Sequence, residues 1–225
     1  MQRRQSHRVR ILITAGPTRE PIDPVRFISN RSSWKMGYAI AEAALEFGHV
    51  VTLISGPTAL TPPAGAEMVQ ITTSDELYEA VHAHTRRCDL LVMCAVVSDY
   101  KPTRSAAEKL EKETGEFALR LMPTRDILAS LPQENRSYFV VGFAAETHDL
   151  AASARRKLFA KNCDIIVAND VSQSDCGMES DENAVTIFFR DQPAETISRA
   201  PKKIIAREIL KIVFRLCEKS LTKKT

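Results

Sequence analysis

The sequence predicts an α/β protein with a Rossmann-like, doubly wound and mostly parallel sheet that carries helices on both faces. Three observations support this prediction. Short apolar runs of strand length alternate with segments of helical composition along most of the chain. These runs are apolar almost without interruption, which is typical of parallel strands covered on both faces. The 225 residues contain no internal repeat and no low-complexity linker, so we expect a single domain.

Strands and helices are expected to alternate from the first strand onward. The first six strands are predicted at residues 9–14, 50–54, 68–71, 89–94, 138–142 and 164–168. Helical segments are predicted between them at residues 35–48, 74–87, 126–131 and 149–162. The first helical segment ends in Gly48, a usual stop signal, and the second begins at Ser74, a residue type that favours the N-cap.

The last part of the chain departs from this alternation. Residues 184–190 and 195–198 flank the turn sequence DQPA and predict a hairpin, and residues 201–219 predict a closing helix with Pro201 in its first turn. Earlier, a highly charged tract contains the alternating sequence FALRL and the turn sequence ETGE. It predicts a protruding flap near residues 100–122, with Lys109 and Lys112 near its base.

Charge and composition exclude several classes of function. The formal net charge is +3, but four arginines lie in the first ten residues and three lysines in the last nine. The body between these ends is slightly acidic, so we expect no nucleic-acid partner. We divide the chain into basic tails at residues 1–8 and 220–225 and one domain at residues 9–219.

Cysteine usage and hydropathy indicate the cellular compartment. Five scattered cysteines form no CxxC pair, which is typical of reduced thiols rather than of a disulfide framework or a zinc site. No run of about 18 apolar residues predicts a transmembrane helix, and the N-terminus lacks the features of a signal peptide. We therefore expect a cytoplasmic protein with no membrane partner.

Ligands of an open parallel sheet bind beyond the carboxyl ends of its strands, so the loops that follow strands are the candidate sites. The loop at residues 15–33 is much longer than usual and contains Gly16. It ends in Ser32 and Ser33 just before the helix, with Lys35 nearby, and this arrangement is able to hold a phosphate. The alternative is that the two serines only cap the helix.

Later strand-end residues also allow two interpretations each. Asp99 either binds sugar hydroxyls, a base or a metal, or it is an ordinary turn residue. Phe143 is either a core residue or a platform on which a base stacks. Lys157 and Lys161 lie four positions apart on one helix face, which is either a solvent face or a phosphate clamp.

Familiar catalytic and cofactor patterns are missing from the sequence. Neither GxGxxG nor GxxxxGK[ST] follows the first strand, and the second strand ends in ISG without the acid that binds the ribose of NAD. No nucleophile–histidine arrangement and no zinc-protease spacing of histidines is recognisable. These absences argue against hydride transfer.

Four motifs nevertheless occur in order: TAGPTREPIDPVRFISNRSSWKMG at residues 14–37, CAVVSDYKP at 94–102, VGFAAET at 141–147 and ANDVS at 168–172. Together they closely resemble bacterial phosphopantothenoylcysteine synthetases, also called phosphopantothenate–cysteine ligases. These enzymes form the synthetase half of the bifunctional coenzyme A biosynthesis flavoprotein. The resemblance covers roughly residues 9–216, and its first motif is long and highly specific.

The resemblance implies a homodimer with a Rossmann-like fold and a CTP-dependent reaction with Mg²⁺. 4′-Phosphopantothenate, L-cysteine and CTP would give phosphopantothenoylcysteine, CMP and diphosphate. The carboxylate first attacks the α-phosphate to form an acyl-cytidylate, and the cysteine amine then displaces CMP. The flavin decarboxylase half has no counterpart in this sequence, so we expect no FMN and a separate decarboxylase for the next step.

The resemblance also implies site residues. Asn30 matches the family's asparagine near the acyl-cytidylate, and Lys109 matches the first lysine of a flap motif implicated in the second half-reaction. Positions that match CTP contacts are Met93, Cys94, Ala95, Asp99, Lys109, Arg125, Asp126, Ile127, Leu128, Phe143, Lys157 and Lys161. The substrate or phosphate loop comprises Gly16, Ser32, Ser33 and Lys35. No metal ligands are identified.

Three positions depart from the family pattern. Trp34 stands where the family usually has glycine, and an indole there would crowd a phosphate or redirect the loop. Glu111 replaces the second of three flap lysines, and the tract Thr124-Arg125-Asp126 replaces the usual N-P-D. Only the departure at Trp34 predicts a lower activity.

Two alternatives to the ligase remain. One is a Rossmann oxidoreductase that uses NAD(P), against which the missing glycine motif argues. The other is a non-catalytic nucleotide-binding relative in which Trp34 blocks catalysis. The presence of Asn30, Asp99 and Lys109 favours the ligase over this second alternative.

Overall fold

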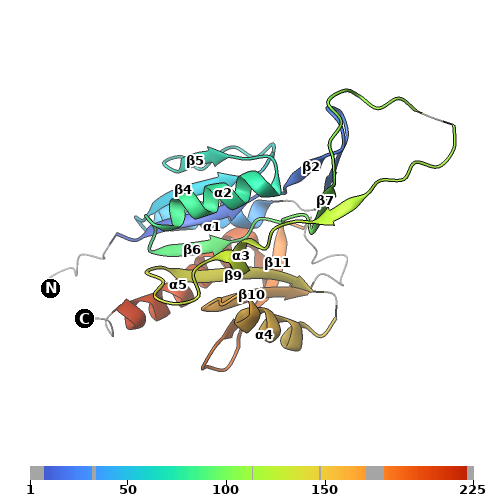
Figure 1. The fold of residues 1–225 in the computed structure, drawn as a ribbon. Helices are drawn as coiled ribbons and strands as arrows, with labels where there is room; N and C mark the ends of the chain where they lie inside the picture. The colour runs from blue at the N-terminus through green and yellow to red at the C-terminus, as the bar shows by residue number, and fades with distance from the viewer. Residues whose placement is uncertain (1–7, 32–33, 113, 147, 171–179, 222–225) are drawn as a thin grey trace, which may run out of the picture.

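The computed structural model describes residues 8–31, 34–112, 114–146, 148–170 and 180–221. Its main feature is an eight-stranded sheet in the order β12-β11-β10-β9-β6-β1-β4-β5 (Figure 1). Its strands, in chain order, are β1 (Arg10–Ala15), β4 (Val50–Ser55), β5 (Glu67–Gln70), β6 (Leu90–Met93), β9 (Phe139–Glu146), β10 (Ile165–Asp170), β11 (Glu182–Phe189) and β12 (Glu195–Pro201). The six predicted strands and the predicted C-terminal hairpin are confirmed; the hairpin, β11 and β12, joins the same sheet, and β9 runs four residues beyond its predicted end.

The direction of the strands places a crevice at one edge of the sheet. All strands from β5 across to β10 are parallel, whereas β11 pairs antiparallel with β10 and β12 pairs antiparallel with β11. The chain builds β4 and β5 on one side of β1 and then crosses to β6 on the other side. A doubly wound sheet binds its ligands at such a change of direction, beyond the carboxyl ends of the strands.

Helices cover both faces of the sheet (Figure 1). On one face α1 (Lys35–Glu46) packs beside α5 (Lys202–Leu221). On the other face lie α2 (Ser74–Thr85), the short α3 (Ile127–Ser130) and α4 (Leu150–Ala160). Each face of the sheet therefore has its own buried apolar cluster, as the near-continuous apolar strands predict.

Two short hairpins extend from the carboxyl edge, and we call residues 19–29 and 100–123 the arm. In the arm β2 (Arg19–Pro21) pairs with β3 (Phe27–Ser29), and β7 (Tyr100–Pro102) pairs with β8 (Leu121–Pro123). Figure 1 shows the segment between β7 and β8 reaching far from the sheet. The predicted flap is therefore present, but only the last residue of FALRL is in a strand, and the β2–β3 hairpin was not predicted.

Asp23 connects the two parts of the arm. Its side chain is inaccessible to solvent, and it accepts hydrogen bonds from the backbone N–H groups of Val25 at 2.8 Å, Arg26 at 2.7 Å and Leu110 at 3.2 Å. The Arg26 guanidinium also donates to this carboxylate. Burial raises the pKa of Asp23, but the hydrogen bonds outweigh burial and hold the pKa well below its usual value. The carboxylate therefore stays ionised where it joins the two parts.

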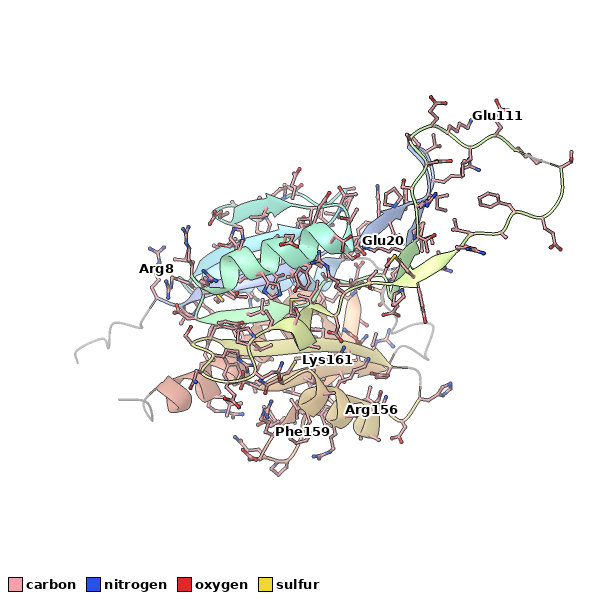
Figure 2. The ribbon with its side chains drawn as sticks, viewed as in Figure 1. Arg8, Glu20, Glu111, Arg156, Phe159 and Lys161 are labelled. Atoms are coloured by element: carbon pink, nitrogen blue, oxygen red, sulfur yellow. The ribbon has the colours of Figure 1, made fainter. Side chains whose placement is uncertain are left out.

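The contact between Asp23 and Leu110 overturns the predicted position of the flap lysines. Lys109 lies next to this contact, beside the turn between β2 and β3, and not beside the base strands β7 and β8. Figure 2 shows the neighbouring Glu111 well away from the sheet. The prediction that Lys109 and Lys112 lie near the base of the flap is wrong, because the chain first runs outward along the β2–β3 hairpin.

Two local predictions at helix starts are also wrong. The N-cap of α2 is Thr73 rather than Ser74, because the Thr73 side chain accepts from the Glu76 N–H while the Glu76 carboxylate accepts from the Thr73 N–H. This capping box satisfies two backbone donors at once. Pro201 ends β12 and precedes α5 instead of forming its first turn.

The structure describes the chain from residue 8 to residue 221, apart from the gaps given above. The predicted basic tails fall almost wholly outside the described residues, and α5 continues to Leu221, past the predicted end of the domain. In the described part of the chain, no helix combines the length and the apolar character needed to cross a membrane.

Gly37 tests the close packing of α1 on the sheet. A Cβ atom at this position would lie 2.6 Å from the Ala15 Cβ and 3.2 Å from the Ala15 Cα. We expect Gly37→Ala to lower the free energy of unfolding by about 1–2 kcal/mol through overpacking, although alanine is the better helix former by about 1 kcal/mol. Urea unfolding measures this change.

Ala15→Gly provides the matched control, because it removes one of the two clashing Cβ atoms. The double variant should lose less stability than the sum of the single losses. A Gly37→Ala protein at least as stable as the wild type would show that α1 is free to move away from β1.

Candidate active site at the carboxyl edge of the sheet

A pocket of about 620 Å³ lies at the carboxyl ends of β1, β6 and β9. The loops that follow β1 and β6, the last part of β9, the N-terminal ends of α1 and α3, and residues of the α4 segment enclose it. A volume in this range suits a small-molecule ligand. The pocket therefore occupies the place that the parallel sheet predicts.

This pocket brings together most of the residues selected from the sequence. Those that line it are Gly16, Asn30, Met93, Cys94, Ala95, Asp99, Arg125, Asp126, Ile127, Leu128, Phe143, Lys157 and Lys161. Lys35 and Lys109 are not part of its lining, and Ser32 and Ser33 lie outside the described residues. The roles of all these residues stay predictions.

Thr14, near the end of β1, fixes the floor of the pocket. Its buried hydroxyl oxygen accepts hydrogen bonds from the backbone N–H groups of Cys94 and Ala95, both at 3.1 Å. The strand end of β6 is thereby held against β1. Sequence reasoning missed Thr14, although a polar residue that closes an apolar strand is a recognisable signal.

The loops after β1 and β6 are joined by their backbones. The Val96 N–H donates to the Gly16 carbonyl at 3.0 Å, and the Thr18 N–H donates to the Val96 carbonyl at 3.2 Å. Gly16 has a φ of +78°, and a Cβ atom there would lie 2.9 Å from the Gly56 nitrogen. Glycine is required at this turn because the backbone conformation and the space both exclude a side chain.

Asn30 follows β3 and reaches the pocket from the arm. Its side-chain Nδ2 donates to the Val97 carbonyl at 3.0 Å, and the preceding Ser29 hydroxyl donates to the Thr18 carbonyl at 2.7 Å. These bonds hold the amide group beside the strand ends. An amide is able to hydrogen-bond a ligand carbonyl without competing as a nucleophile.

Two lysines of the α4 segment border the pocket. The Lys157 Nζ lies 2.8 Å from the Glu146 carboxylate, and Lys161 pairs with Asp126, which also caps α3. Figure 2 shows Lys161 on the α4 side of the sheet. A carboxylate therefore positions each lysine, and an incoming phosphate would compete with that carboxylate for the ammonium group.

Arg125 borders the pocket, but its guanidinium is engaged with α2. Its Nε lies 3.2 Å from the Asp75 carboxylate, and its Nη1 lies 3.1 Å from that of Glu79. The same group lies 3.8 Å from the centre of the Tyr78 ring. In this arrangement the charge of Arg125 serves the packing of the loop before α3 against α2.

Trp34 is the N-cap residue of α1 and lines the pocket. Its φ of +60° lies in the left-handed region, which favours glycine, and its side chain makes no capping hydrogen bond. A glycine here, as in the family that the motifs resemble, would adopt this backbone without strain. Trp34 instead holds this left-handed backbone with a bulky side chain and adds an indole to the pocket wall.

The lining also includes residues that sequence reasoning did not select as site residues, among them Asn169, Asn183 and Lys202. These three come from β10, from β11 and from the start of α5. β11 runs antiparallel to β10, and β12 runs antiparallel to β11. The carboxyl end of β12 therefore lies at the same edge of the sheet as that of β10, where the pocket is. The sequence around Lys202 gives no indication that this lysine lines the pocket. Its location follows only from the directions of β11 and β12.

Cys94 lies on the pocket floor but is unsuited to be a nucleophile. Desolvation raises the pKa of its thiol to about 12, and the nearby charge of Lys202 opposes this rise only in part. Burial likewise raises the pKa values of Cys88 and Cys163 to about 12. These thiols stay protonated at neutral pH, so the pocket contains none of the activation that a catalytic cysteine needs.

The described residues contain no group of three or more His, Cys, Asp or Glu side chains that could hold a metal ion. The carboxylates that line the pocket are those of Asp99 and Asp126. Mg²⁺ commonly uses only one or two protein carboxylates and takes its other ligands from substrate phosphates and water. The pocket therefore fits Mg²⁺ that enters with a nucleotide, and it does not form a metal cage of its own.

Comparison with known proteins identifies relatives over nearly the whole chain. A family model described as "DNA/pantothenate metabolism flavoprotein C-terminal domain" matches residues 6–216. The coenzyme A biosynthesis bifunctional protein CoaBC of Vibrio vulnificus is 45% identical over 205 residues, which cover 89% of this chain and 51% of the relative. The Bacillus subtilis CoaBC protein is 43% identical over 211 residues, which cover 93% and 52%. The chain thus spans about half the length of these relatives.

Solved structures share the fold. The crystal structure of the C-terminal domain of a CoaBC protein is 41% identical with a TM-score of 0.80, covering 94% of this chain and 96% of that one. The DNA/pantothenate metabolism flavoprotein from Streptococcus pneumoniae is 25% identical, also with a TM-score of 0.80, covering 92% and 99%. A Cab2 variant in complex with phosphopantothenate-cysteine is 18% identical with a TM-score of 0.79, covering 96% and 89%, and supports the fold alone.

Trp34 gives a test of backbone strain at the start of α1. We expect Trp34→Gly to be more stable than Trp34→Ala by about 1 kcal/mol, because only glycine adopts the left-handed backbone without a Cβ penalty. Urea unfolding compares the two variants. The Ala83→Gly change on the exposed face of α2 is the control and should lower stability by about 1 kcal/mol. Equal stability of the two Trp34 variants would contradict the strain.

Thiol alkylation tests the raised pKa of Cys94. At pH 8 a pKa of about 12 leaves only about one thiol in ten thousand ionised, so iodoacetamide should modify Cys94 roughly a thousandfold more slowly than a free cysteine. The rate should rise about tenfold per pH unit between pH 7 and 9. Peptide-level mass spectrometry measures it, with urea-unfolded protein as the control. A rate that levels off in this range would refute the raised pKa.

Proposed function

Because the chain belongs to the family of the DNA/pantothenate metabolism flavoprotein C-terminal domain, we propose that it is a phosphopantothenate–cysteine ligase that uses CTP. The observation that carries this proposal is the convergence of the motif residues on one pocket. Residues from four motifs that are far apart in the sequence line the same cavity, at the carboxyl edge of the sheet.

In the proposed first step, a carboxylate oxygen of 4′-phosphopantothenate attacks the α-phosphorus of CTP. The new bond forms an acyl-cytidylate, and the bond to diphosphate breaks. Both reactants are polyanions, so catalysis depends on positioning and on neutralising charge. In this proposal Lys157 and Lys161 bind the triphosphate. They exchange their carboxylate partners, Glu146 and Asp126, for phosphate oxygens as the nucleotide enters.

In the proposed second step, the amine of L-cysteine attacks the acyl carbon and CMP leaves. The amide of Asn30 hydrogen-bonds the carbonyl oxygen as negative charge develops there. The Val97 carbonyl holds this amide in place, so the group does not need to reorganise during the reaction. Mg²⁺, when bound to the triphosphate, supplies further charge neutralisation, and Asp99 and Asp126 would complete its coordination.

Lys109 belongs to the arm and does not line the pocket, so its proposed role depends on where the arm lies. It lies beside the β2–β3 turn, and its proposed role in the second step requires the arm to cover a pocket, either its own or that of a second copy. The arm also exposes several large apolar side chains, which supports the proposed homodimer. They are Val25, Phe27, Tyr100, Phe117, Leu121 and Met122. Light scattering after gel filtration should give the mass of a dimer.

Diphosphate release tests the proposed function. The wild-type protein should release diphosphate from CTP when 4′-phosphopantothenate is present, and added L-cysteine should convert this release into steady turnover. ATP in place of CTP tests the proposed nucleotide preference. Absence of diphosphate release with every nucleotide would refute the ligase and favour a non-catalytic nucleotide-binding protein.

Asn30→Ala tests the proposed catalytic amide. We expect kcat to fall by about 10²–10³, the usual loss when one donor to a developing oxyanion is removed. The KM for CTP should stay within a few fold, because the lysines that bind the triphosphate belong to the α4 segment, whereas Asn30 belongs to the loop between β3 and α1. Circular dichroism checks the fold of the variant. An Asn30→Ala protein as active as the wild type would refute this role.

A further inference from the structure

Lys202 is a nearly fully buried lysine in the wall of the pocket. It is the first residue of α5, only 6% of its surface is exposed, and it borders the same cavity as the residues that the motifs selected. Lysine is among the residues that are least often buried, because removing an ammonium group from water is costly. A buried lysine at a ligand pocket therefore calls for a functional explanation.

The packing of α1 beside α5 brings Lys202 to the pocket. Glu42 of α1 pairs with Lys203 at 2.9 Å, and Glu46 pairs with Arg207 at 2.8 Å. The earlier residue of α1 pairs with the earlier residue of α5, and the later residue pairs with the later one, so the two helices run in the same direction. Both helices therefore begin at the carboxyl edge of the sheet, where the positive ends of their dipoles add to the lysine charge.

The electrostatics of this corner favour an anion. Burial and the positive charge of Lys35 both lower the pKa of Lys202, whereas Asp181 and Cys94 raise it. Asp181 is paired with Lys35, and its side chain is 82% exposed, so solvent screens most of its effect. The charge of Lys202 and the N-terminal ends of α1 and α5 would together attract an anion at this end of the pocket.

Lys202 is separated from the other pocket lysines by the edge of the sheet. Lys157 and Lys161 come from the α4 segment on the opposite face, and the strand ends at Cys94 and Phe143 lie between the two groups. The pocket thus has a cationic end on each face of the sheet. A reaction between two phosphorylated molecules needs two such ends, with the reacting atoms between them.

We propose that Lys202 binds the phosphate group of the phosphorylated acid substrate, opposite the lysines that bind the nucleotide triphosphate. This inference rests on the proposed function and assigns a residue to the second phosphate. The Asn183 side chain, which lines the same end of the pocket and is 6% exposed, supplies a neutral partner beside it.

The test compares Lys202→Met with the wild type on two substrates that differ only in the phosphate, 4′-phosphopantothenate and pantothenate. Methionine keeps the length and apolar stem of the side chain but removes the charge. We expect kcat/KM for phosphopantothenate to fall roughly 10- to 100-fold, as for the loss of a charged hydrogen bond. The kcat/KM for pantothenate and the KM for CTP should change less than about threefold.

Two matched controls accompany this variant. Lys203→Met, the next residue of α5, removes an exposed lysine that only pairs with Glu42, and it should leave all these constants unchanged. Lys157→Met should raise the KM for CTP and leave the ratio between the two acids as in the wild type. Thermal unfolding shows whether Lys202→Met still folds, and if it does not, Lys202→Arg is compared on the same two acids, with its preference for phosphopantothenate kept.

The outcomes separate this inference from the proposed function. If the wild type releases no diphosphate with CTP and phosphopantothenate, the proposed function fails first. If the wild type is active but Lys202→Met lowers kcat/KM equally for both acids, Lys202 has only a structural role. If the variant instead raises the KM for CTP, the lysine binds the nucleotide. Either of the last two results would overturn the proposal.

Discussion

The parallel alignment of β1, β6 and β9 is the constraint on which the site depends. Because these strands share one direction, their carboxyl ends and the loops after them meet at a single edge. Thr14 locks this edge by accepting hydrogen bonds from the backbone of the next strand end, and the Gly16 turn lets the two loops continue side by side. The pocket floor is therefore made of backbone that the sheet already holds, which is the rigid support that a positioning mechanism needs.

The fold was predictable because its signals are local. Most parallel strands are apolar runs that a helical segment follows, so the strand-end loops could be located from the sequence. Asp99, Phe143, Lys157 and Lys161 were candidates from this pattern, whereas Asn30 and the tracts at residues 93–95 and 125–128 were implied by the resemblance. Asn183 and Lys202 were not selected because their location depends on strand direction. Asn183 lies where β11 begins, antiparallel to β10, and Lys202 follows β12, which runs antiparallel to β11. The turn sequence DQPA predicts the hairpin of β11 and β12, but no local pattern tells that β11 pairs antiparallel with β10, so that the chain returns to the carboxyl edge of the sheet.

The arm shows a second kind of limit. Its charged composition predicts exposure, but composition does not tell which charge is buried. Asp23 is one acid among many in the sequence, yet its side chain is inaccessible to solvent and accepts donors from both parts of the arm. Such a carboxylate depends on backbone N–H groups that face inward only after the β2–β3 hairpin has formed. The position of Lys109 follows from this anchor and not from its spacing in the flap motif.

In the proposed function, an acidic body binds phosphorylated ligands through cations that already have partners. Lys157, Lys161 and Lys35 each pair with a carboxylate, so none needs to be brought from solvent or ordered when a phosphate arrives. The exchange of one anion for another keeps the electrostatic energy nearly balanced, and the preference for phosphate then comes from its higher charge and its additional acceptor oxygens. The net charge of the chain, which lies mostly in its tails, has no part in this recognition. What matters is where the sheet and its helices place a few lysines, on both faces of one edge.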